Sequence, residues 1–247
     1  MSHLYLDESL DLSSVAPGTT VAISGDEARH AVTVSRVRAG ERIAIGDGRG
    51  TLVHGVVAST GARELDLTVD EVFVEEGASP RITLVQALAK GDRDELAVQA
   101  ATELGVDEIV PWQAARSVSR WDAAKAAKGR ARWATIVREA AKQAHRAWVP
   151  EVAELTTTAE LARRAAACLV LILEPTATER LSALAVDPGE ERDIVLVVGP
   201  EGGIAPEELD ALAAAGARGV RLGDTVLRTS TAGPAALAVV STALGRW

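Results

Sequence analysis

Two stretches of this 247-residue chain, CLVLILE (168–174) and DIVLVVG (193–199), are apolar at nearly every position, without alternation between apolar and polar residues. A strand with one face in water alternates, whereas a strand covered on both faces does not. Both runs are far shorter than the roughly 20 apolar residues of a membrane span. They therefore predict interior strands of a parallel sheet with helices on both faces, which is the α/β class.

From residue 81 onwards, strand and helix patterns alternate, as they do in α/β units. Further strands are predicted for RITLVQAL (81–88), DEIVPW (107–112) and VRLG (220–223). Helices are predicted over 92–105, about 122–146, 205–216 and 232–244. Pro234 is expected in the first turn of the last helix, where proline is tolerated.

The pattern of residues 20–75 is different, with the short β-type runs TVAIS, RIAIGD, TLVHGVVAS and LDLTVDEVFV separated by turn sequences such as GDGRG. Such spacing predicts a small β-barrel. A short helix or turn is expected between the first two runs. Because EEGASP (75–80) combines charge, Gly, Ser and Pro, we predict an N-terminal domain of residues 1–75 and an α/β domain of residues 76–247.

The formal net charge of −9 argues on its face against a nucleic-acid partner. Residues 112–146, however, hold nine basic residues against two acidic ones, a local charge of +7. Trp112, Trp121, Trp133 and Trp148 lie in or beside this stretch. The combination fits RNA, with arginines on phosphates and indoles stacked on unpaired bases. It fits equally well a solvated helix face with core tryptophans.

Other composition features exclude several classes of protein. The single cysteine, Cys168, allows no internal disulfide, and the four scattered histidines lack the spacing of a helical zinc site. We therefore expect no metal. The N-terminal segment lacks the order of a signal peptide, and no apolar run is long enough for a membrane span. A cytoplasmic location without a membrane partner is expected.

Ligands of parallel sheets bind beyond the carboxyl ends of the strands. Three such ends are candidates, Leu173-Glu174-Pro175, the loop GPEGG (199–203) and the segment LGDTVLRTSTAG (222–233). Neither a dinucleotide fingerprint nor a P-loop is present. The glycines instead favour close backbone approach to a flat heterocycle, although GPEGG can also be a tight connection before a helix. Arg228, between an apolar pair and a hydroxyl-rich helix start, favours a binding loop. Arg93 in KGDRDE is interpreted as a helix-start residue.

These motifs together resemble the RsmE-type 16S rRNA uracil-N3 methyltransferases of the SPOUT superfamily. The resemblance rests on GPEGG followed by PEEL, on LG-x-x-VLRT-x-TA before a helix, on REAAKQAHRAWVPEV (138–152), on KGDRDELAVQAATELGVDEIVP (90–111), and on His30 with Arg36, Arg38 and Gly40. It covers nearly the whole chain. It departs from the family at Val34-Ser35-Arg36, where V-L-R is usual, and at Gly233-Pro234, where family members often have alanine.

The resemblance implies an N-terminal PUA-like barrel that helps to hold RNA and a C-terminal domain with a deep trefoil knot that binds S-adenosylmethionine (SAM) and forms a homodimer. The implied SAM-binding residues are Leu173, Glu174, Val198, Gly199, Pro200, Glu201, Gly202, Gly203, Leu222, Gly223, Val226, Leu227, Arg228 and Thr229. The implied RNA-binding residues are His30, Arg36, Arg38, Arg116, Arg138 and Arg146.

The implied reaction methylates N3 of a uridine near the decoding region of the 16S RNA in the small ribosomal subunit. Because the uracil N3–H is a weakly acidic imide, the site needs a base or stabilisation of the uracil anion. Glu139 and Glu201 are the acid candidates, and Gln143 can recognise the imide edge. The candidates for stabilising the anion are Arg138, Arg146 and Arg228. Glu201 can alternatively restrain its loop. Rival hypotheses are another SPOUT methyltransferase acting on tRNA or a ribose hydroxyl, and a non-catalytic RNA-binding assembly protein.

Overall fold

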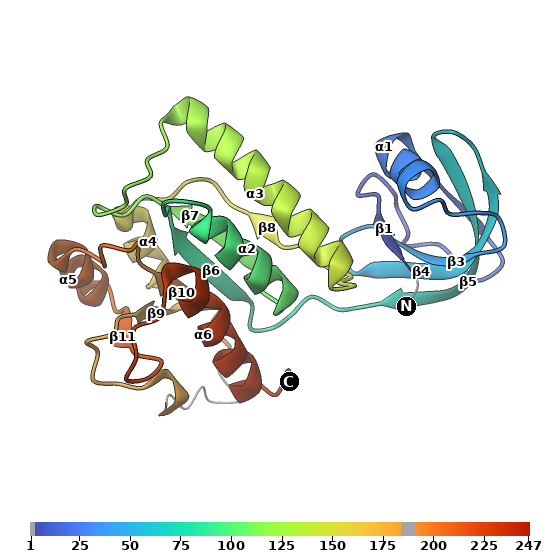
Figure 1. The fold of residues 1–247 in the computed structure, drawn as a ribbon. Coiled ribbons are helices and arrows are strands. Elements are labelled where there is room, and N and C mark those ends of the chain that lie inside the picture. The colour runs from blue at the N-terminus through green and yellow to red at the C-terminus, as the bar shows by residue number, and fades with distance from the viewer. Residues whose placement is uncertain (1–2, 184–190) are drawn as a thin grey trace. The chain divides into compact units, whose positions relative to one another are not determined.

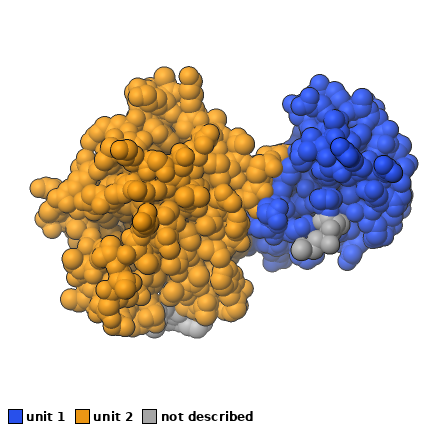
Figure 2. All heavy atoms as spheres, viewed as in Figure 1, with its two compact units in different colours: residues 1–77, 141–149 blue, residues 78–140, 150–247 orange. Residues whose placement is uncertain are grey.

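A computed structural model describes residues 3–183 and 191–247 of the chain. The chain divides into two compact units (Figure 2). Unit 1 consists of residues 1–77 with 141–149, and unit 2 of residues 78–140 with 150–247. The units therefore do not follow simple chain order, because the segment 141–149 counts with the N-terminal unit.

Unit 1 is built on a mixed five-stranded sheet with the order β1-β3-β4-β5-β2 (Figure 1). Its elements are β1 (Leu4–Leu6), β2 (Thr20–Ser24), α1 (Gly25–Arg29), a π-helix η1 (His30–Val34), β3 (Arg42–Gly46), β4 (Thr51–Thr60) and β5 (Glu64–Val74). β1 pairs with β3 in parallel, and the other pairs are antiparallel. The four predicted strands and the short helix are confirmed. One core of buried residues from the sheet and from α1, including Ile23, Ala28 and Ile45, supports the unit.

Unit 2 contains a six-stranded sheet with the order β11-β9-β10-β6-β7-β8, in which every pair is parallel. Its strands are β6 (Ile82–Ala87), β7 (Glu108–Trp112), β8 (Glu151–Val152), β9 (Leu169–Leu173), β10 (Ile194–Val198) and β11 (Arg218–Val220). All residues of β10 are buried, and four of the five in β9. The predicted parallel sheet is confirmed, with both apolar runs in its interior.

Helices cover both faces of this sheet. They are α2 (Arg93–Glu103), α3 (Ala123–Gln143), α4 (Thr158–Arg164), α5 (Pro206–Ala214) and α6 (Thr229–Ala243), with a short 3-10 turn, η2, at Leu181–Ala183. Leu161 of α4 and Leu212 of α5 share a core with Val85 and Val195. A Cβ on Gly233 of α6 would meet Leu84 at 2.9 Å, so α6 packs closely on the opposite face. Because adjacent strand residues point to opposite faces, both faces are buried.

Two local predictions are wrong. The last strand is Arg218–Val220 rather than 220–223, because beyond Val220 the Arg221 N–H donates to the Glu179 carbonyl and the chain leaves the sheet. The last helix begins at Thr229, earlier than predicted, so Pro234 lies inside the helix instead of in its first turn. The first correction matters for function, since it makes Leu222 and Gly223 loop residues. Within residues 3–183 and 191–247, no helix combines the length and hydrophobicity of a membrane span.

Candidate functional site

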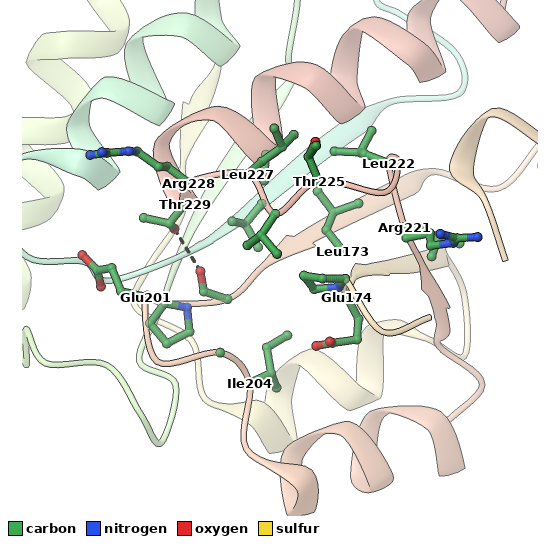
Figure 3. Close-up of a pocket in the computed structure, with 18 of the residues that line it drawn as sticks. Leu173, Glu174, Glu201, Ile204, Arg221, Leu222, Thr225, Leu227, Arg228 and Thr229 are labelled. Atoms are coloured by element: carbon green, nitrogen blue, oxygen red, sulfur yellow. Dashed lines mark hydrogen bonds between the residues drawn. The ribbon is translucent and has the colours of Figure 1, made fainter. Parts of the chain in front are cut away.

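A cavity of about 390 Å³ lies beyond the carboxyl ends of β9, β10 and β11 in unit 2. The loops after these strands form its walls. In Figure 3, Leu227 and Leu222 lie on one side of the space, and Ile204 and Glu174 on the other. The volume is within the range of small-molecule and cofactor sites, about 300–1,000 Å³. Three loops that are far apart in the sequence therefore meet around one space of ligand size.

All residues predicted at the three strand ends as SAM-binding line this cavity, except Gly202. The structure adds lining residues outside this implied set. Pro175, Thr225 and Ala232 lie within the three candidate segments, whereas Arg93, Ile204, Val220 and Arg221 lie outside them. Ile204 directly follows GPEGG (199–203), the glycine loop, and this position was a signal that could have identified it. Arg93 gave no such signal, because it precedes Glu201 by 108 residues.

One hydroxyl joins the cavity's walls to the centre of the sheet. The Oγ1 atom of Thr229 donates to the Gly199 carbonyl at 2.9 Å and accepts from Nε2 of Gln86 at 2.9 Å. Thr229 is 7% exposed and Gln86 is completely buried. The start of α6, the glycine loop and the end of β6 are therefore held in one arrangement by one buried and one partly buried hydrogen bond.

Glu201, the single acid of the glycine loop, is held by two donors. One of its carboxylate oxygens accepts from the Lys90 N–H at 3.1 Å and from Nη1 of Arg93 at 2.8 Å. Burial raises the pKa of Glu201, but hydrogen bonds from its own N–H, from Lys90 and from Arg93 outweigh it, so the pKa is lower than usual. A carboxylate with a lowered pKa is a weaker proton acceptor. The contacts therefore suit Glu201 to restraining the loop.

The glycine loop is also tied on its other side. Nη1 of Arg116 donates to the Gly202 carbonyl at 3.2 Å, which explains why Gly202 contacts Arg116 instead of the cavity. Gly203 has a φ of +71°, a conformation that side chains with a Cβ rarely adopt. The loop needs a glycine at this position.

The loop after β11 is stabilised by ion pairs outside the cavity. Asp224 pairs with Nη1 of Arg221 at 2.6 Å and with Nη2 of Arg180 at 3.2 Å. Figure 3 shows the Arg221 guanidinium directed away from the space enclosed by the other labelled residues. The Nε of Arg221 is buried and, among the residues that the structure describes, has no hydrogen-bond partner. This Nε–H is covered by protein, so it is not available to a ligand in the cavity.

The predicted RNA-binding and catalytic residues outside the cavity are distributed over both units. His30, Arg36 and Arg38 are exposed in unit 1, Arg116 is exposed in unit 2, and Arg138 and Arg146 are half-buried. Arg138 pairs with Glu139 at 3.4 Å. In the described part of the chain, neither Glu139 nor Gln143 is a lining residue of the cavity.

Two of the tryptophans near the basic stretch lie in the protein interior, which argues against the RNA-stacking interpretation for them. Trp112 and Trp133 are buried, with 0% and 1% of their surface exposed. Trp121 packs edge-on against Trp133, with 5.4 Å between ring centroids, and Nε1 of Trp148 donates to the Glu75 carbonyl. Base stacking by Trp112 or Trp133 is therefore excluded, because their rings are inaccessible.

Comparisons with known proteins agree with the geometry of both units. Residues 76–241 match the model of an RNA methyltransferase domain, and residues 23–70 match that of an RNA methyltransferase PUA domain. Ribosomal RNA small subunit methyltransferase E of Mycobacterium bovis is 45% identical over 98% of this chain and 92% of its own. The Bacillus subtilis protein of the same name is 31% identical over 98% and 96%.

Solved structures give the same result. A ribosomal RNA small subunit methyltransferase E from Neisseria gonorrhoeae, bound to S-adenosyl methionine, has a TM-score of 0.85 at 30% identity and 98% coverage of both chains. A methyltransferase from Legionella pneumophila in complex with SAM has a TM-score of 0.86 at 29% identity and the same coverage. The resemblance carried by the sequence motifs is thus confirmed, and the chain belongs to the ribosomal RNA small subunit methyltransferase E family.

Proposed function

We propose that this protein transfers a methyl group from SAM to N3 of one uridine near the decoding region of 16S ribosomal RNA. The observation that carries the proposal is the cavity itself, in which the three strand-end motifs of the sequence meet. Membership of the methyltransferase E family supports the substrate class. We place the activity in the cytoplasm, with the small ribosomal subunit or its RNA as the partner.

The residues around the cavity fit SAM. Apolar side chains of Leu173, Leu222 and Leu227 provide walls for a flat ring, and Glu174 offers a carboxylate for hydroxyl groups. A Cβ on Gly223 would have no atom within 4 Å, so the wall is open there. When bound, SAM supplies an electrophilic methyl group. The chain's residues supply its orientation and the exclusion of water.

The uracil must lose its N3 proton before its lone pair can attack. Arg228 lines the cavity and is exposed, so in our proposal it stabilises negative charge on the uracil oxygens. We assign Glu201 the role of restraining the loop, because Arg93 and Lys90 occupy its carboxylate. Glu139 then remains as the proton acceptor and Gln143 as the group that recognises the imide edge. N3 is on the pairing edge, so the uridine has to be unpaired.

We further propose the domain roles that the resemblance implies. Residues 1–75 hold RNA through His30, Arg36 and Arg38, while residues 76–247 form the knotted catalytic domain, with Arg116, Arg138 and Arg146 on phosphates. Because Glu139 and Gln143 are not lining residues of the cavity, the proposal requires a second subunit to bring them to it. The active form is then a homodimer with sites at the shared interface.

The dimer proposal is tested by mixing two inactive variants, Arg228→Ala and Glu139→Ala, after joint unfolding and refolding. If Glu139 acts on the partner's cavity, half of the sites in mixed dimers are intact, and activity returns to about a quarter of the wild-type level. If Glu139 acts within its own chain, every site carries one defect and no activity returns.

The reaction itself is tested by mass-spectrometric nucleoside mapping of small-subunit RNA from a deletion strain. We expect N3-methyluridine to be absent at one position, and to return with the wild-type gene but not with Arg228→Ala. An undiminished level of N3-methyluridine would contradict the proposal. A missing tRNA or ribose methylation would favour another SPOUT methyltransferase, and a failure to bind SAM in calorimetry would favour a non-catalytic RNA-binding protein.

A further inference from the structure

Arg93 has a position that helix-start chemistry does not explain. It is the first residue of α2, but its side chain lines the cavity and forms a 2.8 Å ion pair with Glu201 of the glycine loop. We propose that Arg93 is a further substrate-binding residue, which contacts a phosphate of the RNA strand that carries the target uridine. Glu201 is its positioning residue. This inference rests on the proposed function.

The geometry of Arg93 leaves it available to a ligand. Its side chain is 41% exposed, and one of its five N–H groups donates to Glu201. A guanidinium fixed on one edge by a carboxylate presents its remaining donors in a planar fork, which matches the oxygens of a phosphate. The backbone supports this placement, because the Lys90 N–H donates to the same Glu201 oxygen.

The charge around Arg93 favours an anion. Arg116 donates to Gly202 of the same loop, and Arg228 lines the cavity; both are exposed. Figure 3 shows Arg228 and Glu201 on the same side of the cavity. Arg93, Arg116 and Arg228 therefore contact the glycine loop or lie on the Glu201 side of the cavity.

The acids at the start of α2 differ in how far a ligand can reach them. Asp94 is buried and accepts from the N–H groups of Ala89 and Glu95, and Glu95 is paired with Arg132. The exposed Asp92 remains as a nearby negative charge. Counted formally, Glu201, Asp92 and Asp94 balance Arg93, Arg116 and Arg228. Because Asp94 is buried while Arg116 and Arg228 are exposed, the charge that a ligand meets is more positive than this sum.

The same charges indicate whether Arg93 binds the RNA or the cofactor. SAM carries a sulfonium and an ammonium against one carboxylate, so its net charge is positive, and a group of arginines is poorly complementary to it. An RNA strand carries one negative charge per nucleotide, and arginines that bind its phosphates supply most of the affinity. The arginines on the Glu201 side therefore fit the strand that delivers the uridine.

The experiment measures two affinities separately in the full-length protein. Binding of unmethylated small-subunit RNA is measured by filter retention, without cofactor, at several salt concentrations, and binding of SAM is measured by calorimetry. For Arg93→Ala we expect about a tenfold weaker Kd for RNA and a salt slope smaller by about 0.7, the loss of one single-strand phosphate contact. The Kd for SAM should stay within about twofold of wild type. Arg163→Ala, which removes an exposed arginine on α4, is the matched control.

Glu201→Gln tests the positioning role, because two explanations predict opposite signs. Removing a negative charge should tighten RNA binding if Glu201 acts only through its charge. If Glu201 positions Arg93, the variant should weaken RNA binding severalfold, and adding Arg93→Ala should cause little further loss. Glutamine retains an oxygen that can accept from both Lys90 and Arg93, so the variant removes the charge of the ion pair while the loop keeps its acceptor. Circular dichroism and urea midpoints check folding.

Several outcomes would overturn the inference. RNA affinity and salt slope of Arg93→Ala equal to those of Arg163→Ala would remove Arg93 from the RNA site. A weaker Kd for SAM with unchanged RNA binding would assign Arg93 to the cofactor, and tighter RNA binding by Glu201→Gln would refute positioning. A wild-type protein that does not bind SAM would contradict the proposed function instead, and the RNA measurements would still decide the role of Arg93.

Discussion

Replacing Thr229 by valine should destabilise unit 2 while leaving the shape of the side chain unchanged. The substitution removes the hydroxyl that donates to the Gly199 carbonyl and accepts from Nε2 of Gln86. Leaving a buried polar group without its partner costs about 1–3 kcal/mol. The Gln86 amide is completely buried and incurs this cost, although its second bond to the Ala87 carbonyl persists. The Gly199 carbonyl is at the cavity, where water can replace the lost donor, so its cost is at the low end.

Together these costs predict a decrease of about 2–4 kcal/mol in the free energy of unfolding for Thr229→Val. Thr229→Ser is the matched control, since it keeps the hydroxyl and removes one methyl group, at about 1 kcal/mol. Urea unfolding followed by tryptophan fluorescence measures the difference, because Trp112 and Trp133 are buried in unit 2 and report on its core. The reasoning is refuted if the valine variant is as stable as the serine variant.

Three further predictions concern the reaction, the cavity and the pH dependence. Arg228→Ala should reduce methyl transfer at least about a hundredfold with little change in the urea midpoint, since Arg228 is exposed; retained activity would remove it from the site. Gly199→Ala places a Cβ 2.6 Å from Cγ1 of Ile204, so it should cost about 1–3 kcal/mol of stability and weaken SAM binding in calorimetry. Gly223→Ala, whose Cβ has no protein atom within 4 Å, should leave the stability unchanged. Burial raises the pKa of Glu108, but hydrogen bonds from Arg164 and Thr83 outweigh this effect, so the pKa of the folded state is lower than usual. The contribution of Glu108 to stability is therefore complete above the unfolded pKa near 4.5, and it is lost as the pH falls through the lower folded value. Urea unfolding between about pH 6 and about pH 3 should thus show a shallower loss for Glu108→Gln than for wild type, and parallel curves would contradict the assignment.

The local elements of the fold followed from the sequence because their causes are local. Uninterrupted apolar runs identified β9 and β10 as interior strands, and the alternation of strand and helix patterns gave the parallel sheet. Predictions were wrong where contacts between residues far apart in the sequence determine the structure. The strand predicted at 220–223 ends at Val220 because the Arg221 N–H donates to the Glu179 carbonyl of another loop, which no periodicity reveals.

The cavity was predictable in its position but not in its internal bonds. Glycine-bearing loops after buried strands indicated where a ligand binds, and nearly all residues selected there line one space. The sequence could not indicate that Arg93 reaches Glu201 or that Gln86 reaches Thr229, since these partners are 108 and 143 residues apart. It also could not separate core tryptophans from stacking ones, because burial depends on which helices pack together.

The sequence by itself determined the type of each element, the parallel sheet and the three strand ends that carry the chemistry, since hydrophobic period and glycine placement act over a few residues. The tertiary structure alone decided which groups meet. The strand order β11-β9-β10-β6 differs from the order along the chain, and this order brings the ends of β9, β10 and β11 to one cavity. It also decided that Glu201 is held by Arg93, so that the acid most prominent in the sequence is suited to orienting an arginine rather than to accepting a proton.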